Sequence, residues 1–108
     1  MNDKVRESDW KHFKKVSQLA LERICERALS DVVDAASDSS VSHHERYLSV
    51  YRKIKDYDEQ IASAFDGLSR SKMTMQLAIM QRLKLIEDSE REAFTQDVKD
   101  QLDLFATS

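Results

Sequence analysis

The chain of 108 residues contains no proline and only one glycine. Because tight turns draw heavily on these two residues, their scarcity argues against an all-β fold. The single cysteine, Cys25, cannot form an internal disulfide, which is typical of the reducing cytoplasm. No apolar run approaches the roughly 20 residues that a membrane-spanning helix requires, and polar residues follow Met1 where a signal peptide would be apolar. We therefore expect a cytoplasmic helical protein with no membrane contact.

An excess of positive charge is also lacking, since the net charge is −3. Proteins that bind nucleic acid directly are usually basic, so no direct nucleic-acid contact is expected. Charged residues of both signs make up 34% of the chain and hydrophobic residues 41%, a balance typical of amphipathic helices around a core. The length fits a single helical domain, 1–108, in which residues 1–7 and 100–108 are candidate flexible tails.

The most regular stretch of the chain runs from Ser42 to Leu68. Ser42 and Glu45 form a capping-box pattern that predicts a helix start, and Gly67 suits the left-handed residue with which many helices end. Apolar residues recur between them at helical spacing and share an arc of roughly 140°. They are Tyr47, Val50, Tyr51, Ile54, Tyr57, Ile61, Ala62, Phe65 and Leu68. This stretch therefore predicts one long amphipathic helix.

A second amphipathic helix precedes the loop at 36–41, which is short enough to force an antiparallel hairpin. Its main apolar face consists of Trp10, Phe13, Ala20, Leu21, Ile24, Ala28 and Ala35. Ser17 interrupts this face and predicts a break near residues 15–17. Leu19, Leu29 and Val33 point the other way. We favour cover by neighbouring helices of the same chain for this smaller patch, with a subunit contact as the alternative.

A third helix is predicted over residues 70–84, capped by Ser69 or Ser71. Its apolar positions form two adjoining stripes, Met73, Leu77, Met80 and Leu83 in one and Met75, Ile79 and Ile86 in the other. A helix this apolar is typical of a core element laid across the hairpin. The alternative is a homodimer interface, because C2 self-association is common and methionines adapt to partners. Its residues would be Met73, Met75, Ile79 and Ile86.

The last predicted helix begins at a second capping-box pattern, Ser89 to Glu92, and turns Phe94 and Val98 inward. How far this helix runs is left open by its sequence, because the pattern of apolar residues continues to the last turns before the C-terminus. The fold expected from the whole chain is all-α, a four-helix arrangement built on a long antiparallel hairpin.

Few residues are candidates for chemistry. Asp58 falls within the apolar arc of the central helix, where an isolated acid could act in catalysis, although a structural hydrogen bond to a tyrosine or arginine is favoured for it and for Asp31. Arg70 lies near a helix start, where a cation opposes the helix dipole, so it could meet an acidic partner or a phosphate; a solvated face is the default. The adjacent His43 and His44 point about 100° apart, so no metal or cofactor is expected.

Three segments carry a resemblance that extends over most of the chain. They are residues 7–12 (Glu-Ser-Asp-Trp-Lys-His), 44–48 (His-Glu-Arg-Tyr-Leu) and 64–71 (Ala-Phe-Asp-Gly-Leu-Ser-Arg-Ser). Together they are similar to a group of short helical bacterial proteins without assigned function. The resemblance implies a bacterial, cytoplasmic protein and no particular chemistry.

A shorter resemblance lies near the C-terminus, in Gln101-Leu102-Asp103-Leu104-Phe105. All five positions match the sliding-clamp-binding motif of bacterial replication and repair proteins, glutamine-leucine-serine/aspartate-leucine-phenylalanine. The resemblance implies an extended peptide in which Leu104 and Phe105 fill an apolar pocket, Gln101 makes a polar contact and Leu102 a further one.

The same residues also suit a helix, because Phe94, Val98, Leu102 and Phe105 share one helical face. This alternative explains Leu104 poorly, since that side chain points about 80° away from the stripe. Helix end is the favoured interpretation of residues 101–105, and clamp binding remains the alternative.

The first functional hypothesis is therefore a non-enzymatic helical interaction protein, acting as a homodimeric adaptor or regulator. An accessory protein of replication or repair, docked on the DNA polymerase sliding clamp by its C-terminal tail, is the alternative. A small enzyme that uses Asp58 is the weakest hypothesis, because no nucleophile–base pair or glycine-rich phosphate loop accompanies it.

Overall fold

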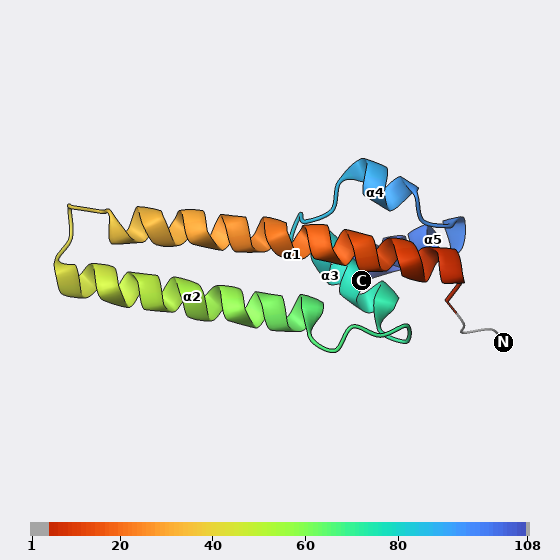
Figure 1. Ribbon diagram of the computed structural model, residues 1–108, viewed down its shortest axis with the longest axis horizontal. Coiled ribbons are helices and arrows are strands. Elements are labelled where there is room, and N and C mark those ends of the chain that lie inside the picture. Colours follow the sequence, from red (N-terminus) through yellow and green to blue (C-terminus); the bar gives the residue numbers. More distant parts are fainter. Residues whose placement is uncertain (1–4, 108) are drawn as a thin grey trace.

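The computed structural model describes residues 5–107, and the fold is all-α, as predicted (Figure 1). The helices are α1 (Glu7–Ala36), α2 (His43–Phe65), α3 (Met73–Arg82), α4 (Asp88–Glu92) and α5 (Gln96–Thr107). The predicted fourth helix is thus two helices, a short α4 and a longer α5. Of the two predicted tails, residues 1–4 lie outside the described range, whereas residues 100–107 are helical and belong to α5.

Helices α1 and α2 form the long antiparallel hairpin expected from the short loop between them (Figure 1). Ser42 caps α2, since its hydroxyl accepts the Glu45 backbone N–H at 3.1 Å, and Gly67 has the predicted positive φ of 59°. The predicted break near residues 15–17 does not occur. Ser17 is buried inside a continuous α1, where its hydroxyl donates to the Phe13 carbonyl one turn earlier and so needs no other partner.

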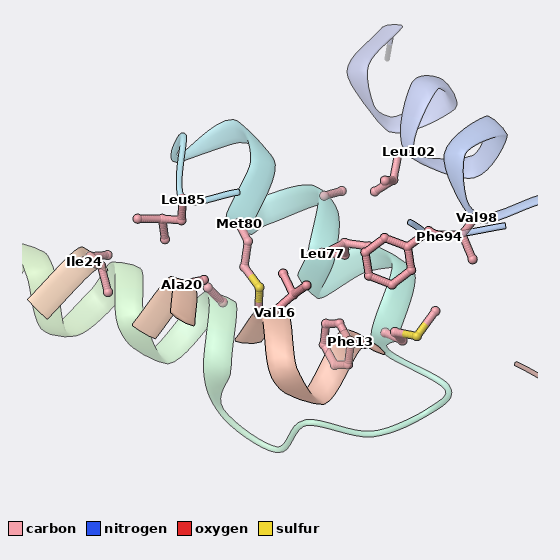
Figure 2. Close-up of a cluster of buried hydrophobic side chains, with 13 residues drawn as sticks. Phe13, Val16, Ala20, Ile24, Leu77, Met80, Leu85, Phe94, Val98 and Leu102 are labelled. Atoms are coloured by element: carbon pink, nitrogen blue, oxygen red, sulfur yellow. The ribbon is translucent and has the colours of Figure 1, made fainter. Parts of the chain in front are cut away.

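The hydrophobic core lies at one end of this hairpin, where the first half of α1 meets α3 and α5 (Figure 2). Its buried members are Phe13, Val16, Ala20, Ile24, Ala64, Met73, Leu77, Ala78, Met80, Leu85, Phe94, Val98 and Leu102. No residue between Ile24 and Ala64 is fully buried. Residues 25–63, here called the hairpin arm, therefore project from the core, and the molecule measures 58 × 24 × 23 Å.

Helix α3 is shorter than predicted at both ends. It begins at Met73 after a turn, with Lys72 before it in place of a serine cap. At the other end Lys84 has a positive φ of 61°, and the Leu85 N–H bonds the Met80 carbonyl at 2.9 Å. This is the Schellman arrangement, in which a left-handed residue closes the helix, with lysine at the position that usually holds glycine. Sequence gave no sign of it, because lysine has no preference for positive φ.

Candidate functional site

The C-terminal motif lies within α5, so residues 101–105 are helical and not extended. Leu102 is only 1% exposed and belongs to the core. The Gln101 side-chain oxygen accepts the Thr74 hydroxyl at 2.9 Å, and Asp103 pairs with Arg91 at 2.7 Å. The first part of the motif is therefore held against α3 and α4, as the helix-end interpretation predicted, and would have to leave these contacts to bind as an extended peptide.

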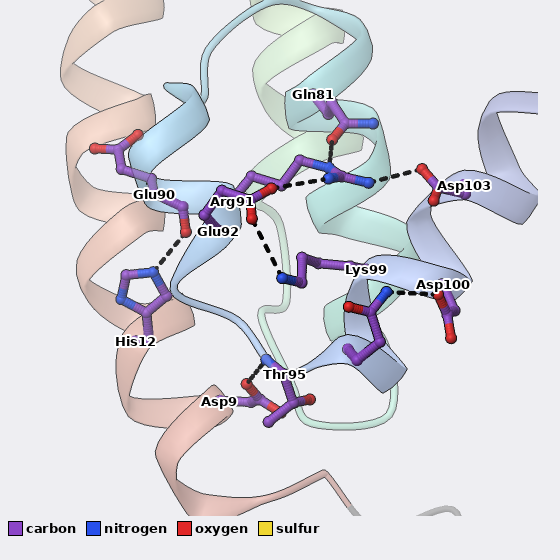
Figure 3. Close-up of polar contacts among 11 residues, drawn as sticks. Asp9, His12, Gln81, Glu90, Arg91, Glu92, Thr95, Lys99, Asp100 and Asp103 are labelled. Atoms are coloured by element: carbon purple, nitrogen blue, oxygen red, sulfur yellow. Dashed lines mark hydrogen bonds and ion pairs between the residues drawn. The ribbon is translucent and has the colours of Figure 1, made fainter.

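Helix α5 is also fixed at its start, by a contact with α1 (Figure 3). The buried carboxylate of Asp9 accepts the Thr95 backbone N–H at 3.0 Å and the Thr95 hydroxyl at 2.7 Å. Asp9 lies in the first turn of α1, and Thr95 directly precedes α5. One carboxylate thus sits at the N-termini of two helices, where both dipoles favour negative charge. This contact spans 86 positions in sequence, and no local pattern predicts it.

A second anchor joins α1 to α4. The guanidinium of Arg23 forms a two-pronged ion pair with the Glu90 carboxylate, at 2.7 and 2.8 Å, and donates to the Leu85 carbonyl at 2.8 Å. The Glu90 carboxylate also accepts the Glu87 backbone N–H at 2.9 Å, so it caps α4. The Arg23 hydrogen bond, above all, lowers the pKa of the Glu90 carboxyl below its ordinary value, although burial opposes this effect.

This shift predicts a pH dependence of stability. The pKa of Glu90 is lower in the folded chain than in the unfolded chain. The contribution of this carboxylate to the free energy of unfolding is therefore complete above the unfolded pKa of about 4.3. That contribution is lost as the pH falls through the folded pKa. We expect Glu90→Gln to lower the free energy of unfolding at neutral pH and to lessen its decline toward acid pH. Carboxyl NMR titration should show the Glu90 midpoint rising toward its ordinary value in Arg23→Gln, and an unchanged midpoint would contradict the assignment.

The end of the motif differs from its beginning, because Leu104 is 69% exposed and Phe105 is 37% exposed. Both side chains line a shallow depression between α3 and α5, together with Ser71, Thr74, Met75 and Gln101. The two residues that the resemblance assigns as anchors therefore lie at the surface, while Leu102 does not.

The predicted dimer surface on α3 is only partly exposed. Met73 is 1% exposed and packs in the core, so its assignment to a surface is wrong. Ile79 and Ile86 are half-buried against the same core, and Met75 alone of the four is well exposed, at 45%. The reason is that α3 packs against α1, α2 and α5 together, which covers most of its circumference. The core interpretation of this helix therefore describes it better than the interface one.

The two candidate polar residues, Arg70 and Asp58, lie in different surroundings. Arg70 pairs with Glu7 at 2.9 Å and lies over the Trp10 ring, 5.4 Å from its centroid. Asp58 is exposed on α2, and within residues 5–107 no hydrogen bond or ion pair joins it to Arg70. The exposed position removes the reason for treating Asp58 as a buried acid. No group of histidine, cysteine and acidic side chains suited to a metal occurs in the described part of the chain.

The structural bond expected between a carboxylate and a tyrosine is made by Asp31. Its carboxylate accepts the Tyr57 hydroxyl across the two helices of the hairpin arm, and this bond raises the pKa of Tyr57. Both side chains are part-buried. The bond fixes which sides of α1 and α2 face each other along the arm, and hence which sides face outward.

Five of the exposed large apolar side chains lie on the two helices of this arm. They are Leu29 (66% exposed), Val33 (61%), Tyr47 (68%), Tyr51 (59%) and Ile54 (47%). We call these five residues the arm face. The expectation that Leu29 and Val33 are covered by helices of the same chain is wrong, because α3, α4 and α5 gather at the other end of the hairpin (Figure 1). The sign of this surface in the sequence was that Leu29 and Val33 point away from the main apolar face of their helix.

Helical geometry places the arm face on one side of the hairpin. Ala28 and Val32 face α2 along the line where the two helices meet, which we call the seam. Leu29 and Val33 each come one residue later, so their side chains point about 100° away from the seam. On α2, Tyr51 likewise follows Val50. Because the helices run antiparallel, the residue after each seam position turns to the same side of the hairpin. The core residues Ala20 and Ile24 come one residue before positions on the seam, so their side chains point to the side of the hairpin opposite the arm face. Helix α3 belongs to the same core and therefore lies on that side too.

Charge is divided unevenly between the two helices of the arm. On α1 the arm carries three carboxylates, from Glu26, Asp31 and Asp34, and one cation, Arg27. The Arg27 guanidinium is bound to the Leu83 carbonyl at 2.9 Å. The part of α2 within the arm carries four cations, Arg46, Arg52, Lys53 and Lys55, and four carboxylates, Glu45, Asp56, Asp58 and Glu59. The α1 side of the arm is therefore net acidic, whereas the charges on its α2 side balance.

Comparison of the chain with protein-family models, with curated proteins and with solved structures found no match. Among residues 5–107, none of the helices combines the length and the apolar character that crossing a bilayer requires. The surface and contacts described above are therefore the basis for a functional assignment.

Proposed function

We propose that this protein is a non-enzymatic helical interaction protein whose binding surface is the arm face. The observation that carries the proposal is the exposure of five large apolar side chains on one side of a projecting hairpin. Scattered apolar side chains are normal at a surface, whereas a contiguous set bordered by charged residues is typical of a protein-binding site. Two tyrosines in the set fit this role, because tyrosine offers a large contact area with little loss of conformational freedom.

Site-specific photocrosslinking tests this proposal. We expect a photoreactive benzoylphenylalanine in place of Tyr51 to give a discrete protein adduct in cells. The matched control carries the same group in place of Asp56, which is exposed on the opposite side of the same helix. A partner bound to the arm face gives an adduct at Tyr51 and little or none at Asp56. Equal labelling at both positions, or none at either, would contradict the proposal.

Docking on a sliding clamp through residues 101–105 is the second candidate function, and the exposure of Leu104 favours it. The bound peptide would be extended, so the last turns of α5 must first leave the contacts that Thr74 and Arg91 make. A protein that is competent to bind only part of the time has an apparent affinity reduced by that fraction. Clamp binding by the folded chain would therefore be weak.

Titration of the chain with a bacterial sliding clamp tests this candidate. We expect the double substitution of Leu104 and Phe105 by alanine to abolish binding. Arg91→Ala, which removes the 2.7 Å pair with Asp103, should strengthen it about twofold to fivefold by releasing α5. Binding that is insensitive to the double substitution, or no binding in either background, would exclude the motif as a clamp ligand.

A further inference from the structure

We infer that the arm face binds an amphipathic helix of another protein, apolar where it meets the loop end of the arm and basic where it meets the end nearer the core. This inference rests on the proposed function, because it names the kind of partner that occupies the same surface. The observation that carries it is the order of apolar and acidic side chains along the two helices of the hairpin.

One line of side chains on α1 changes from acidic to apolar toward the loop. Glu22 and Glu26 precede Leu29 and Val33 at successive spacings of four, three and four residues, and all four side chains are exposed. Such spacing places them within an arc of about 60° on one side of the helix. The two carboxylates therefore continue the α1 part of the arm face toward the core.

The corresponding line on α2 is arranged in the same way. Tyr47, Tyr51, Ile54 and Asp58 follow one another at the same spacings, and all four side chains are exposed. Because α2 runs antiparallel to α1, its apolar residues also lie toward the loop and its carboxylate toward the core. Both lines are therefore apolar at the loop end of the hairpin and acidic at the other end.

We call Glu22, Glu26 and Asp58 the acidic end of this surface. Within residues 5–107 no hydrogen bond or ion pair engages the side chains of these three residues. Of the four cations on the arm part of α2, Lys55 borders the line that contains Asp58, about 70° from it, and the other three are turned away by more than 100°. On α1 the Arg27 guanidinium is bound to the Leu83 carbonyl. The acidic end is therefore not paired within the chain.

Charge selects the occupant of this surface. A partner that covers the apolar side chains also removes water from the acidic end, and a carboxylate that loses water without gaining a partner opposes binding. An occupant with Lys or Arg at this end replaces the water with ion pairs, whereas nucleic acid or an anionic membrane is repelled. A second copy of this chain does not meet the requirement, because its own two lines of side chains bring the same carboxylates and no cation.

The shape of the surface favours a helix as the occupant. The two lines of side chains lie on adjacent antiparallel helices, and a third helix can pack on both with its own side chains between theirs. Each line extends over about 17 Å, so a helix of about 12 residues covers it. Because a helix this short is marginally stable alone, we expect it to belong to a folded partner or to become ordered on binding.

Photocrosslinking from position 51 supplies the probe for the test, because mass spectrometry of the digested adduct locates the contacted segment of the partner. We expect a segment whose apolar residues recur at helical spacing and which carries two or more Lys or Arg residues on the same face. A synthetic peptide with the sequence of that segment is then the ligand whose affinity is measured.

Calorimetric titration of the full chain with this peptide tests the acidic end. Glu26→Lys with Asp58→Lys should weaken binding about tenfold or more, because it sets cations against cations. Asp34→Lys with Asp56→Lys is the matched control, which changes the net charge equally at positions turned about 100° or more from the two lines. It should weaken binding by no more than about twofold at physiological salt. All four positions are exposed, so both variants should keep the wild-type circular dichroism spectrum and thermal unfolding.

A charge exchange completes the test. A peptide whose Lys and Arg residues are replaced by Glu should bind the Glu26→Lys, Asp58→Lys variant more tightly than it binds the wild-type chain, since opposite charges again meet. Equal losses in the two double variants, a contacted segment without a cation on its apolar face, or a segment of this chain itself would overturn the inference. A discrete adduct at position 51 would then still uphold the proposed function, whereas no adduct at that position would contradict both, so the two failures are distinguishable.

Discussion

Replacing Leu102 with alanine should lower the free energy of unfolding by about 2–4 kcal/mol, the usual cost of emptying a fully buried leucine site. Leu102 is 1% exposed and packs with α3 and the Phe94 region in the core (Figure 2). For a chain of this size we expect Tm to fall by roughly 10 °C or more. Chemical denaturation, monitored by circular dichroism, measures the loss directly.

Leu104 provides the matched control, two positions later in the same helix and in the same motif. At 69% exposure, its replacement by alanine should change the free energy of unfolding by no more than about 0.5 kcal/mol. A clear difference between the two variants would show that residues 101–105 are docked as a helix in solution. Equal and small effects would instead show that the end of α5 is detached, and the clamp candidate would then become the stronger one.

The hairpin could be predicted from the sequence because its signals are local. Ser42 and Gly67 mark the two ends of α2 through hydrogen bonds and backbone geometry within a few residues of themselves. The spacing of apolar residues likewise depends only on the helical repeat, so it identified Phe13 and Phe94 as inward-facing before any tertiary contact was known. Features of this kind do not require knowledge of what lies next to the helix.

The division of the last helix could not be predicted, because its cause is distant in sequence. Neither proline nor glycine marks the break near Thr95; the break is stabilised by the Asp9 carboxylate, which takes up the Thr95 N–H and hydroxyl. The left-handed conformation of Lys84, which ends α3, also depends on a residue distant in sequence. Arg27 on α1 donates hydrogen bonds to the Leu83 and Lys84 carbonyls. In both cases the partner that makes the conformation favourable lies on another helix.

The arm face shows a different limit. Periodicity identified the apolar sides of α1 and α2, but it cannot tell which part of an apolar side is covered. Which part is buried depends on where α3, α4 and α5 pack, and they pack against the first half of α1. The residues left exposed, such as Leu29 and Tyr51, belong to the same kind of pattern as the buried ones. For this reason the predicted dimer surface fell on α3, the most apolar helix, although α3 packs between α1, α2 and α5.

Arg23→Ala should lower the free energy of unfolding by about 2–3 kcal/mol. Both terminal nitrogens of the Arg23 guanidinium donate to the Glu90 carboxylate. One of them also donates to the Leu85 carbonyl, next to the left-handed turn that ends α3. Loss of the guanidinium leaves a carboxylate that is only 12% exposed without its main partner, together with a carbonyl that loses its donor. Urea unfolding at neutral pH measures this cost.

Arg6→Ala provides the comparison, because its ion pair with Asp97 is 4.0 Å long and both side chains are well exposed. Such pairs contribute little, so a change of no more than about 0.5 kcal/mol is expected. Arg23→Lys should fall between the two, since lysine keeps the charge but cannot bind both carboxylate oxygens and the carbonyl in one plane. If Arg23→Ala instead behaved like Arg6→Ala, α4 would not be held to α1 by this contact. The core and the Asp9–Thr95 contact would then have to position α5, whose docking decides whether Gln101 to Phe105 can reach a partner.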